Sequence, residues 1–304
     1  MSQAELENFD EVVDIICRRV AEKLAQKGLL TTALADLAGG QGCAECSGCG
    51  HCVSLKPEAV KNIVASGAER IGAKTGIRGA GIDAKMAAMI DHTLLKPDAT
   101  REQLMQICAE AKQYGFATVC VNSANIPLAA RQLRGSTVKP IAVVGFPLGA
   151  ATSQAKAFEA REAVQAGAEE IDMVINIGAL KSKDYKTVFE DIRTVVESAK
   201  PHKVKVILET AQLNNEEKVI ACSLAKTAGA AFVKTSTGFG GGGATVEDIA
   251  LMRRIVGRDM EVKASGGIRT REDAQKMIQA GADRIGASAS VAIVTGQDAK
   301  KRTY

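Results

Sequence analysis

The chain has 304 residues, of which 46% are hydrophobic and 24% charged, and its formal net charge is +4. No apolar run approaches the roughly 18 residues that a membrane-spanning helix needs, and the N-terminal residues lack the uninterrupted apolar core of a signal peptide. Aromatic residues make up 3%, and the one dense basic run is Lys300–Arg302, which argues against nucleic acid as the main partner. We therefore expect a cytoplasmic protein with neither a membrane nor nucleic acid as a partner.

Residues 1–82 are expected to form a small, helical and Cys-rich extension. From residue 5 to residue 26, hydrophobic side chains recur at helical spacing while charges fill the other face, which predicts an amphipathic helix. Its apolar face would include Phe9, Val13, Ile16 and Val20. A Gly-rich segment and a second short helix after Pro57 follow. Five glycines within residues 66–81 then indicate a linker, so we place the domain boundary at residue 82.

The extension contains four cysteines in the pattern CxxCxxCxxC: Cys43, Cys46, Cys49 and Cys52. Dense cysteines in a cytosolic chain indicate a metal site more often than disulfides. Four thiolates could bind a structural Zn²⁺ tetrahedrally or hold an iron–sulfur cluster. The spacing matches neither pattern well, and we favour zinc.

Residues 83–304 alternate between strand-like and helical segments. Several helical patterns end in Ala-Gly-Ala just before a strand, where glycine suits a left-handed helix C-cap. Eight such strands predict a (β/α)8 TIM barrel. The alternative, an open doubly wound sheet, is disfavoured because no GxGxxG follows the first strand. The predicted strands are Met89–Leu94, Ala117–Asn122, Pro140–Phe146, Glu170–Asn176, Val204–Glu209, Ala231–Thr235, Glu261–Ala264 and Arg284–Ala287.

Three charged residues interrupt otherwise apolar strands, and in a barrel such positions carry the chemistry. They are Asp172, Lys234 and Lys263. A single barrel lysine could equally make a structural ion pair. Two lysines on adjacent strands, however, cannot both stay charged in a low-dielectric site without cost, so one is expected to be a neutral amine. A neutral amine can attack a carbonyl and form a Schiff base, with Asp172 as acid–base group.

The loops after the last two strands have the composition of a phosphate site. Ser265–Arg269 and Arg284–Ser288 expose backbone N–H groups beside glycines, and barrels commonly bind phosphate there. Simple turn formation is the alternative for each loop alone. The run Gly240–Gly243 indicates either a mobile loop near the site or a flexible connection.

With these motifs in order along the chain, residues 84–296 resemble the deoxyribose-phosphate aldolase family of class I aldolases. The resemblance rests on Met89–Leu95, Thr118–Val121, Val144–Pro147, Glu170–Val174, Phe232–Gly238 and Val262–Arg269. It implies a (β/α)8 barrel that reversibly cleaves 2-deoxy-D-ribose 5-phosphate to D-glyceraldehyde 3-phosphate and acetaldehyde. It further implies that no cofactor takes part, because a lysine imine supplies the electron sink.

The resemblance also implies individual roles. Lys234 would form the imine with acetaldehyde, Lys263 would lower the pKa of Lys234, and Asp172 would transfer protons through a water. Substrate binding would involve Asp91, Cys120, Gly238, Gly266, Gly267, Arg269, Gly286, Ser288 and the C-terminal Tyr304. Cys120 could equally be a packed thiol. Ala289 departs from the family, where many members have a second serine, and Ser290 is a candidate replacement.

Two readings of the extension and two other functions stay open. The N-terminal helix could dock on its own barrel or on a neighbouring subunit of a homo-oligomer. Its likeness to appended helices of aldolases packaged in bacterial microcompartments implies instead a shell or cargo protein as partner. The alternative functions are another Schiff-base aldolase or transaldolase with a different carbonyl donor, and a non-catalytic Cys-cluster scaffold.

Overall fold

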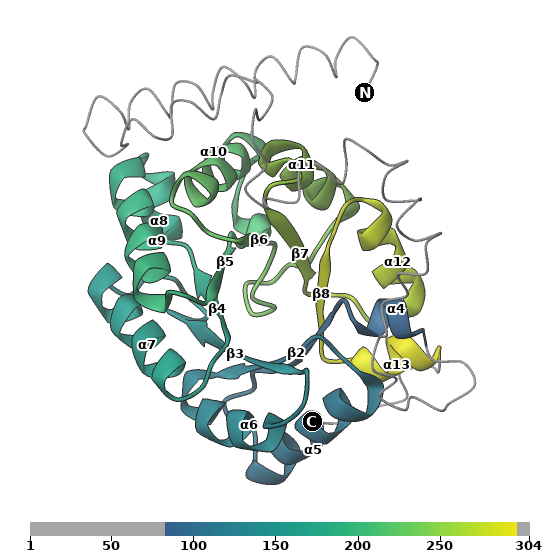
Figure 1. Cartoon of the computed structure of the whole chain (residues 1–304). Helices are drawn as coiled ribbons and strands as arrows, with labels where there is room; N and C mark the ends of the chain where they lie inside the picture. Colours follow the sequence, from purple (N-terminus) through teal and green to yellow (C-terminus); the bar gives the residue numbers. More distant parts are fainter. Residues whose placement is uncertain (1–82, 297–304) are drawn as a thin grey trace, which may run out of the picture. The chain divides into compact units, whose positions relative to one another are not determined.

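The computed structural model describes residues 83–296, which form a closed barrel of eight parallel strands in sequential order. In Figure 1 the strands form an inner ring and the helices lie outside it. The barrel predicted from the sequence is confirmed. Its strands are β1 (Ile90–Leu94), β2 (Thr118–Asn122), β3 (Lys139–Val144), β4 (Glu170–Val174), β5 (Lys203–Ile207), β6 (Phe232–Lys234), β7 (Glu261–Ser265) and β8 (Arg284–Ala287).

Ten α-helices and two 3₁₀ helices lie between or flank the strands within residues 83–296, with α4 before β1 and α13 after β8. The 3₁₀ helices follow β2 (η2, Ser123–Asn125) and β5 (η3, Thr210–Gln212). The α-helices are α4 (Ala84–Ala87), α5 (Arg101–Tyr114), α6 (Ile126–Leu133), α7 (Ser153–Gln165), α8 (Ile177–Lys181), α9 (Tyr185–Ala199), α10 (Asn215–Thr227), α11 (Val246–Val256), α12 (Arg271–Gln279) and α13 (Ser290–Thr295).

Local sequence explains where the longer helices begin and end. Capping boxes open three of them, because the side chains of Thr100, Asn214 and Thr270 accept from the third backbone N–H of α5, α10 and α12. The predicted C-terminal glycines also occur, with φ of 107° at Gly167 and 114° at Gly281. These left-handed conformations are unstrained in glycine, so each helix stops and the chain turns into the next strand.

The strands have two buried faces of different character. Side chains that point outward, such as Val119 and Val262, are mostly apolar and pack beneath the helices, with the polar His92 as an exception on β1. Those that point into the barrel include five fully or nearly fully buried charged residues: Asp91, Asp172, Lys205, Lys234 and Lys263. Strand register sets their neighbours, since Lys234 pairs with Lys263 and Asp172 pairs with Lys205 across adjacent strands.

Within the described range, no helix combines the length and apolar character needed to cross a membrane. Several sequence predictions fall outside that range. These are the amphipathic helix, the four clustered cysteines Cys43, Cys46, Cys49 and Cys52, the boundary at residue 82, and Tyr304.

Candidate active site

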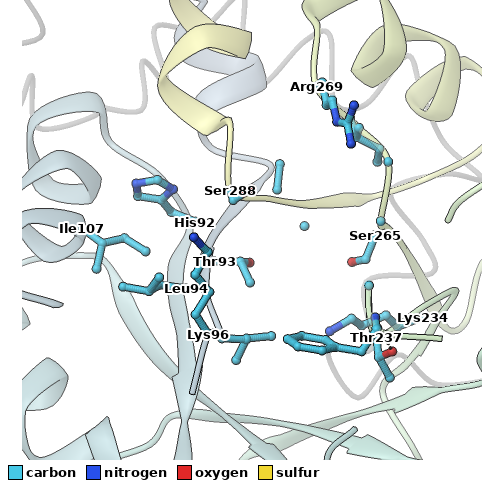
Figure 2. A pocket seen from close by; sticks show the side chains of 18 residues that line it. His92, Thr93, Leu94, Lys96, Ile107, Lys234, Thr237, Ser265, Arg269 and Ser288 are labelled. Carbon is cyan, nitrogen blue, oxygen red and sulfur yellow. Dashed lines mark hydrogen bonds between the residues drawn. The ribbon is translucent and has the colours of Figure 1, made fainter. Parts of the chain in front are cut away.

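A cavity of about 410 Å³ opens at the carboxyl ends of the barrel strands. Its wall comes from β1, from the loop after β6 and from the loops after β7 and β8. Figure 2 shows Lys234 on one side of the cavity, Arg269 and Ser288 at its upper end, and His92 on the opposite side. The cavity therefore joins the predicted amine to both predicted phosphate loops.

Asp172 lies between the two predicted lysines. Its Oδ2 atom is 2.8 Å from Lys234 Nζ and 2.8 Å from Lys263 Nζ. All three side chains are buried, and Lys234 is the one of the three that lines the cavity. Lys263 is held from a second side as well, because Asp91 Oδ2 lies 2.5 Å from its Nζ.

Further charges lie deeper in the barrel. Lys205 Nζ is 3.0 Å from Asp172 Oδ1 and also pairs with Glu170. Arg284 Nη2 lies 2.5 Å from Asp91 Oδ1 and 3.5 Å from Glu170 Oε2. The Phe232 ring lies under both cations, with its centroid 5.0 Å from Lys205 Nζ and 5.8 Å from the Arg284 guanidinium carbon. The ring thus stabilises the cations through its face.

The charges of this network do not balance when every group is ionised. It joins three carboxylates (Asp91, Glu170 and Asp172) to four cations (Lys205, Lys234, Lys263 and Arg284). A surplus positive charge inside a low-dielectric barrel is unfavourable. Loss of one lysine proton removes the surplus.

The surroundings indicate which lysine loses its proton. Burial disfavours both ammonium groups, but Asp172 and Asp91 outweigh burial at Lys263 and raise its pKa above the ordinary lysine value. Lys234 has Asp172 as its carboxylate partner, so burial prevails and, together with the charge of Lys263, lowers the pKa of Lys234. Lys234 is therefore the amine of the pair that more readily becomes neutral.

The two aspartates stay ionised. Burial would raise the pKa of Asp172, but Lys205, Lys234 and Lys263 outweigh it and hold that pKa well below its usual value. At Asp91, Lys263, Arg284 and Lys205 likewise outweigh burial and lower the pKa. Asp172 therefore lies beside the amine as a carboxylate, the form that can accept a proton.

Glycines allow the phosphate loops to approach each other closely. Gly266 and Gly267 have φ of 87° and 78°, which L side chains rarely adopt. A Cβ at Gly243 would lie 2.6 Å from the Gly266 carbonyl oxygen, and one at Gly286 would lie 3.0 Å from Lys263 Cε. Gly243 thus packs against the loop after β7, so this end of the Gly240–Gly243 run lies next to the site, although the run is not among the cavity-lining residues.

The structure separates the predicted binding residues into two groups. Those of the phosphate loops all line the cavity: Gly238, Gly266, Gly267, Arg269, Gly286 and Ser288. Asp91 and Cys120 are fully buried and are not among its lining residues. Cys120 packs with Leu95, Ile141 and Val143, and burial raises the pKa of its thiol to about 11. The packed-thiol reading of Cys120 fits this environment.

Some residues of the site were not identified from the sequence. Lys205 sits between Val204 and Val206 in a strand, the same signal that identified Lys234 and Lys263. Glu170 and Arg284 stand at the first residues of their strands, where charge is common, so pattern alone does not mark them. Ser290 is fully buried and donates to the Ala287 carbonyl at 2.8 Å, so its hydroxyl does not replace a serine at Ala289.

Comparison with known proteins agrees with this geometry. A family model described as DeoC/LacD family aldolase matches residues 85–298. A deoxyribose-phosphate aldolase from Streptococcus sanguinis is 62% identical over 215 residues, which cover 71% of this chain and 98% of the relative. One from Listeria welshimeri is 60% identical over 217 residues, covering 71% and 97%.

A solved structure gives the same result. The deoxyribose phosphate aldolase from Aeropyrum pernix, described as a unique tetrameric structure, superimposes with a TM-score of 0.66 at 34% identity. The match covers 70% of this chain and 91% of that one. On barrel, cavity and sequence together, the chain belongs to the DeoC/LacD family of aldolases.

Proposed function

We propose that the chain is a deoxyribose-phosphate aldolase, which reversibly cleaves 2-deoxy-D-ribose 5-phosphate to D-glyceraldehyde 3-phosphate and acetaldehyde. The observation that carries the proposal is the placement of Lys234. Its amine has a lowered pKa and lines a cavity whose far end consists of glycine-rich loops. The close relatives named deoxyribose-phosphate aldolase support the choice of substrate.

In the synthetic direction, Lys234 Nζ attacks the carbonyl carbon of acetaldehyde. The carbinolamine that forms loses water and becomes a protonated imine. Loss of a proton from the adjacent carbon gives an enamine, which attacks the aldehyde carbon of glyceraldehyde 3-phosphate. Water then releases the product and regenerates the amine. Asp172, 2.8 Å from Lys234 Nζ, transfers the protons through a water, and the lysine imine supplies the electron sink without a metal or organic cofactor.

The remaining charges divide between tuning the amine and binding phosphate. Lys263, which stays charged between Asp172 and Asp91, disfavours a second positive charge on Lys234. The phosphate would bind to backbone N–H groups of Gly238, Gly266, Gly267 and Gly286. Arg269 and Ser288 are exposed at the same end of the cavity and would add a charge and a hydroxyl.

Reductive trapping tests the proposal directly. Borohydride added with acetaldehyde should reduce the imine and leave an ethyl group on Lys234, which peptide mass spectrometry locates. A label on Lys263 would reverse the two lysine assignments. Acetaldehyde and dihydroxyacetone phosphate should then be compared as donors with glyceraldehyde 3-phosphate as acceptor. Turnover with dihydroxyacetone phosphate as donor but not with acetaldehyde would indicate another Schiff-base aldolase.

The parts of the chain outside the described residues carry further proposals. The four clustered cysteines would hold a structural metal ion, with zinc favoured over an iron–sulfur cluster because four thiolates suit a tetrahedral ion. Tyr304 would fold over the site. The N-terminal amphipathic helix would bind a partner helix or groove, with a microcompartment shell or cargo protein as the partner that the resemblance suggests.

We also propose that the protein is a cytoplasmic homo-oligomer. If its N-terminal helix binds a shell or cargo protein, the oligomer would lie inside a microcompartment. The tetrameric description of the Aeropyrum pernix relative supports self-association. A compartment would retain the volatile acetaldehyde beside the enzyme that consumes it.

A further inference from the structure

A buried histidine on the outer face of β1 connects three elements of the barrel wall. His92 is 2% exposed, and its Nδ1 atom lies 2.9 Å from Ser290 Oγ, at the first residue of α13. Its Nε2 atom lies 2.9 Å from Glu110 Oε2 on α5. The Phe116 ring packs against the imidazole at a centroid distance of 5.0 Å and an interplanar angle of 61°. Figure 2 shows His92 and Lys234 on opposite sides of the cavity.

The hydrogen-bond partners assign the protons of this network. Ser290 has one hydroxyl proton, which it donates to the Ala287 carbonyl at 2.8 Å. Its oxygen must then accept from His92 Nδ1–H. On the other side of the ring, a proton must lie between Nε2 and the Glu110 carboxylate, since two lone pairs would otherwise face each other. That shared proton closes the contact between Nε2 and Glu110 Oε2, while Nδ1–H donates to Ser290.

The residues fixed by this network belong to the phosphate end of the cavity. Ala287 follows Gly286 at the end of β8, and Ser288 and Ala289 complete the turn into α13. Gly286, Ala287 and Ser288 all line the cavity. The other end of α13 is held separately, by the Arg271 guanidinium on the carbonyl oxygens of Ile293 and Val294. His92 and Ser290 therefore hold the end of α13 nearest the ligand.

We infer that His92 is a positioning residue for phosphate recognition, which holds the β8–α13 loop through Ser290 and is itself oriented by Glu110. The inference rests on the proposed function, because it assigns the phosphate of the substrate to this loop. His92 acts at the end of the cavity opposite Lys234, so its loss should weaken binding of the phosphate and leave the imine chemistry intact.

Two substitutions separate the two ring nitrogens. His92→Gln places an amide nitrogen near the position of Nε2, so it keeps the Glu110 contact and loses the Ser290 contact. His92→Asn does the reverse, because its amide nitrogen lies near the position of Nδ1. We expect His92→Gln to raise KM for 2-deoxy-D-ribose 5-phosphate about tenfold, the effect of one well-placed hydrogen bond, with kcat nearly unchanged. His92→Asn should raise KM less.

The substrate without phosphate provides the decisive comparison. For 2-deoxy-D-ribose, which has the same reacting carbonyl, kcat/KM should be the same in wild type and His92→Gln. Ser290→Ala should reproduce the phosphate-specific rise in KM and carries the test if the histidine variants do not fold. Ser223→Ala is the matched control, because Ser223 is also buried and donates to a backbone carbonyl, that of Val219 in α10.

The outcomes distinguish this inference from the proposed function. An equal loss of kcat/KM on both substrates in Ser290→Ala and His92→Gln, or no change on either, would overturn the positioning role. An unprotonated Nδ1 in the ¹⁵N spectrum of the wild-type imidazole would overturn the assigned hydrogen bond to Ser290. Absence of wild-type turnover of 2-deoxy-D-ribose 5-phosphate would instead refute the proposed function.

Discussion

At the scale of single residues, two lysine side chains have different pKa values because they have different charged neighbours. Lys234 and Lys263 are neighbours in register on adjacent strands and share Asp172. A second carboxylate, Asp91, contacts Lys263. The extra carboxylate helps to raise the pKa of Lys263, while burial and the charge of Lys263 lower the pKa of Lys234, because the free energy of a buried ammonium depends strongly on the charges that face it.

The first prediction at this scale concerns Lys263→Leu. Removing the Lys263 charge leaves Lys234 facing Asp172 alone, so the pKa of Lys234 should rise. Each unit of that rise lowers the neutral amine fraction about tenfold at a pH below the pKa. Turnover near neutral pH should therefore fall by at least about a hundredfold and recover in part at alkaline pH. The measurement is the pH dependence of kcat.

Two results would contradict this tuning role. One is a variant whose pH profile has the wild-type shape at lower amplitude. The other is a variant that circular dichroism shows to be folded and that keeps wild-type turnover near neutral pH. Lys263→Arg serves as the control because it keeps the charge, so its profile should lie closer to that of the wild type.

At the scale of elements, the loops after β6 and β7 determine the shape of the phosphate end. Buried Glu209 accepts from the Thr237 backbone N–H at 3.2 Å and from its hydroxyl, and Thr237 Oγ1 in turn accepts from Phe239 N–H at 3.0 Å. Glu209 has a φ of 56°, a conformation unusual for a side-chain-bearing residue. These contacts place Gly238 and Phe239 at the cavity.

The prediction for this element is a selective effect of Gly243→Ala. The Cβ of the new alanine would lie 2.6 Å from the Gly266 carbonyl oxygen. The backbone at residue 243 or at Gly266 must therefore move. We expect KM for 2-deoxy-D-ribose 5-phosphate to rise about fivefold or more, since displaced N–H groups bind phosphate less well. Steady-state kinetics with the phosphorylated substrate are the measurement.

Gly178→Ala is the matched control for that substitution. A Cβ there would meet Asn176 Oδ1 at 3.6 Å, an ordinary contact, so kinetics should match the wild type. If Gly243→Ala behaved like this control, close packing of the two loops would not matter for binding.

At the scale of the whole molecule, the candidate site lies within residues 91–288. The match to the family model likewise begins at residue 85. We therefore expect a chain that begins at Ile82 to fold and keep most of its aldolase activity, and to lose the bound metal that we propose for the cysteines. Activity and metal content of the truncated and full-length chains are the measurements. A folded but inactive truncated chain would show that the extension contributes to the site.

A substitution in the full-length chain tests the partner proposal separately. Ile16→Glu places a charge on the predicted apolar face of the N-terminal helix, so it should abolish co-purification with a shell or cargo protein and leave kcat unchanged. Glu11→Lys on the predicted polar face is the control, because it should alter neither. Retained association in Ile16→Glu would rule out this face as the docking surface.

Much of the architecture was available from local patterns. The eight strands and the long helices follow from apolar periodicity, capping residues and Ala-Gly-Ala stops, each of which acts over a few residues. The strand predicted over Arg284–Ala287 has the bounds that β8 has in the structure. Charged residues inside apolar strands likewise identified Asp172, Lys234 and Lys263, because a buried charge is too costly to occur without a partner.

The tertiary structure decided which charged residues contact one another. Strand register and barrel closure bring Asp91 from β1 against Lys263 from β7, and Arg284 from β8 against Glu170 from β4. The His92, Glu110 and Ser290 contacts join residues up to 198 positions apart. The sequence by itself determined which residues carry charge and which segments form strands. Which amine loses its proton depends on distances between strands, since electrostatic energies in a buried site change steeply with separation.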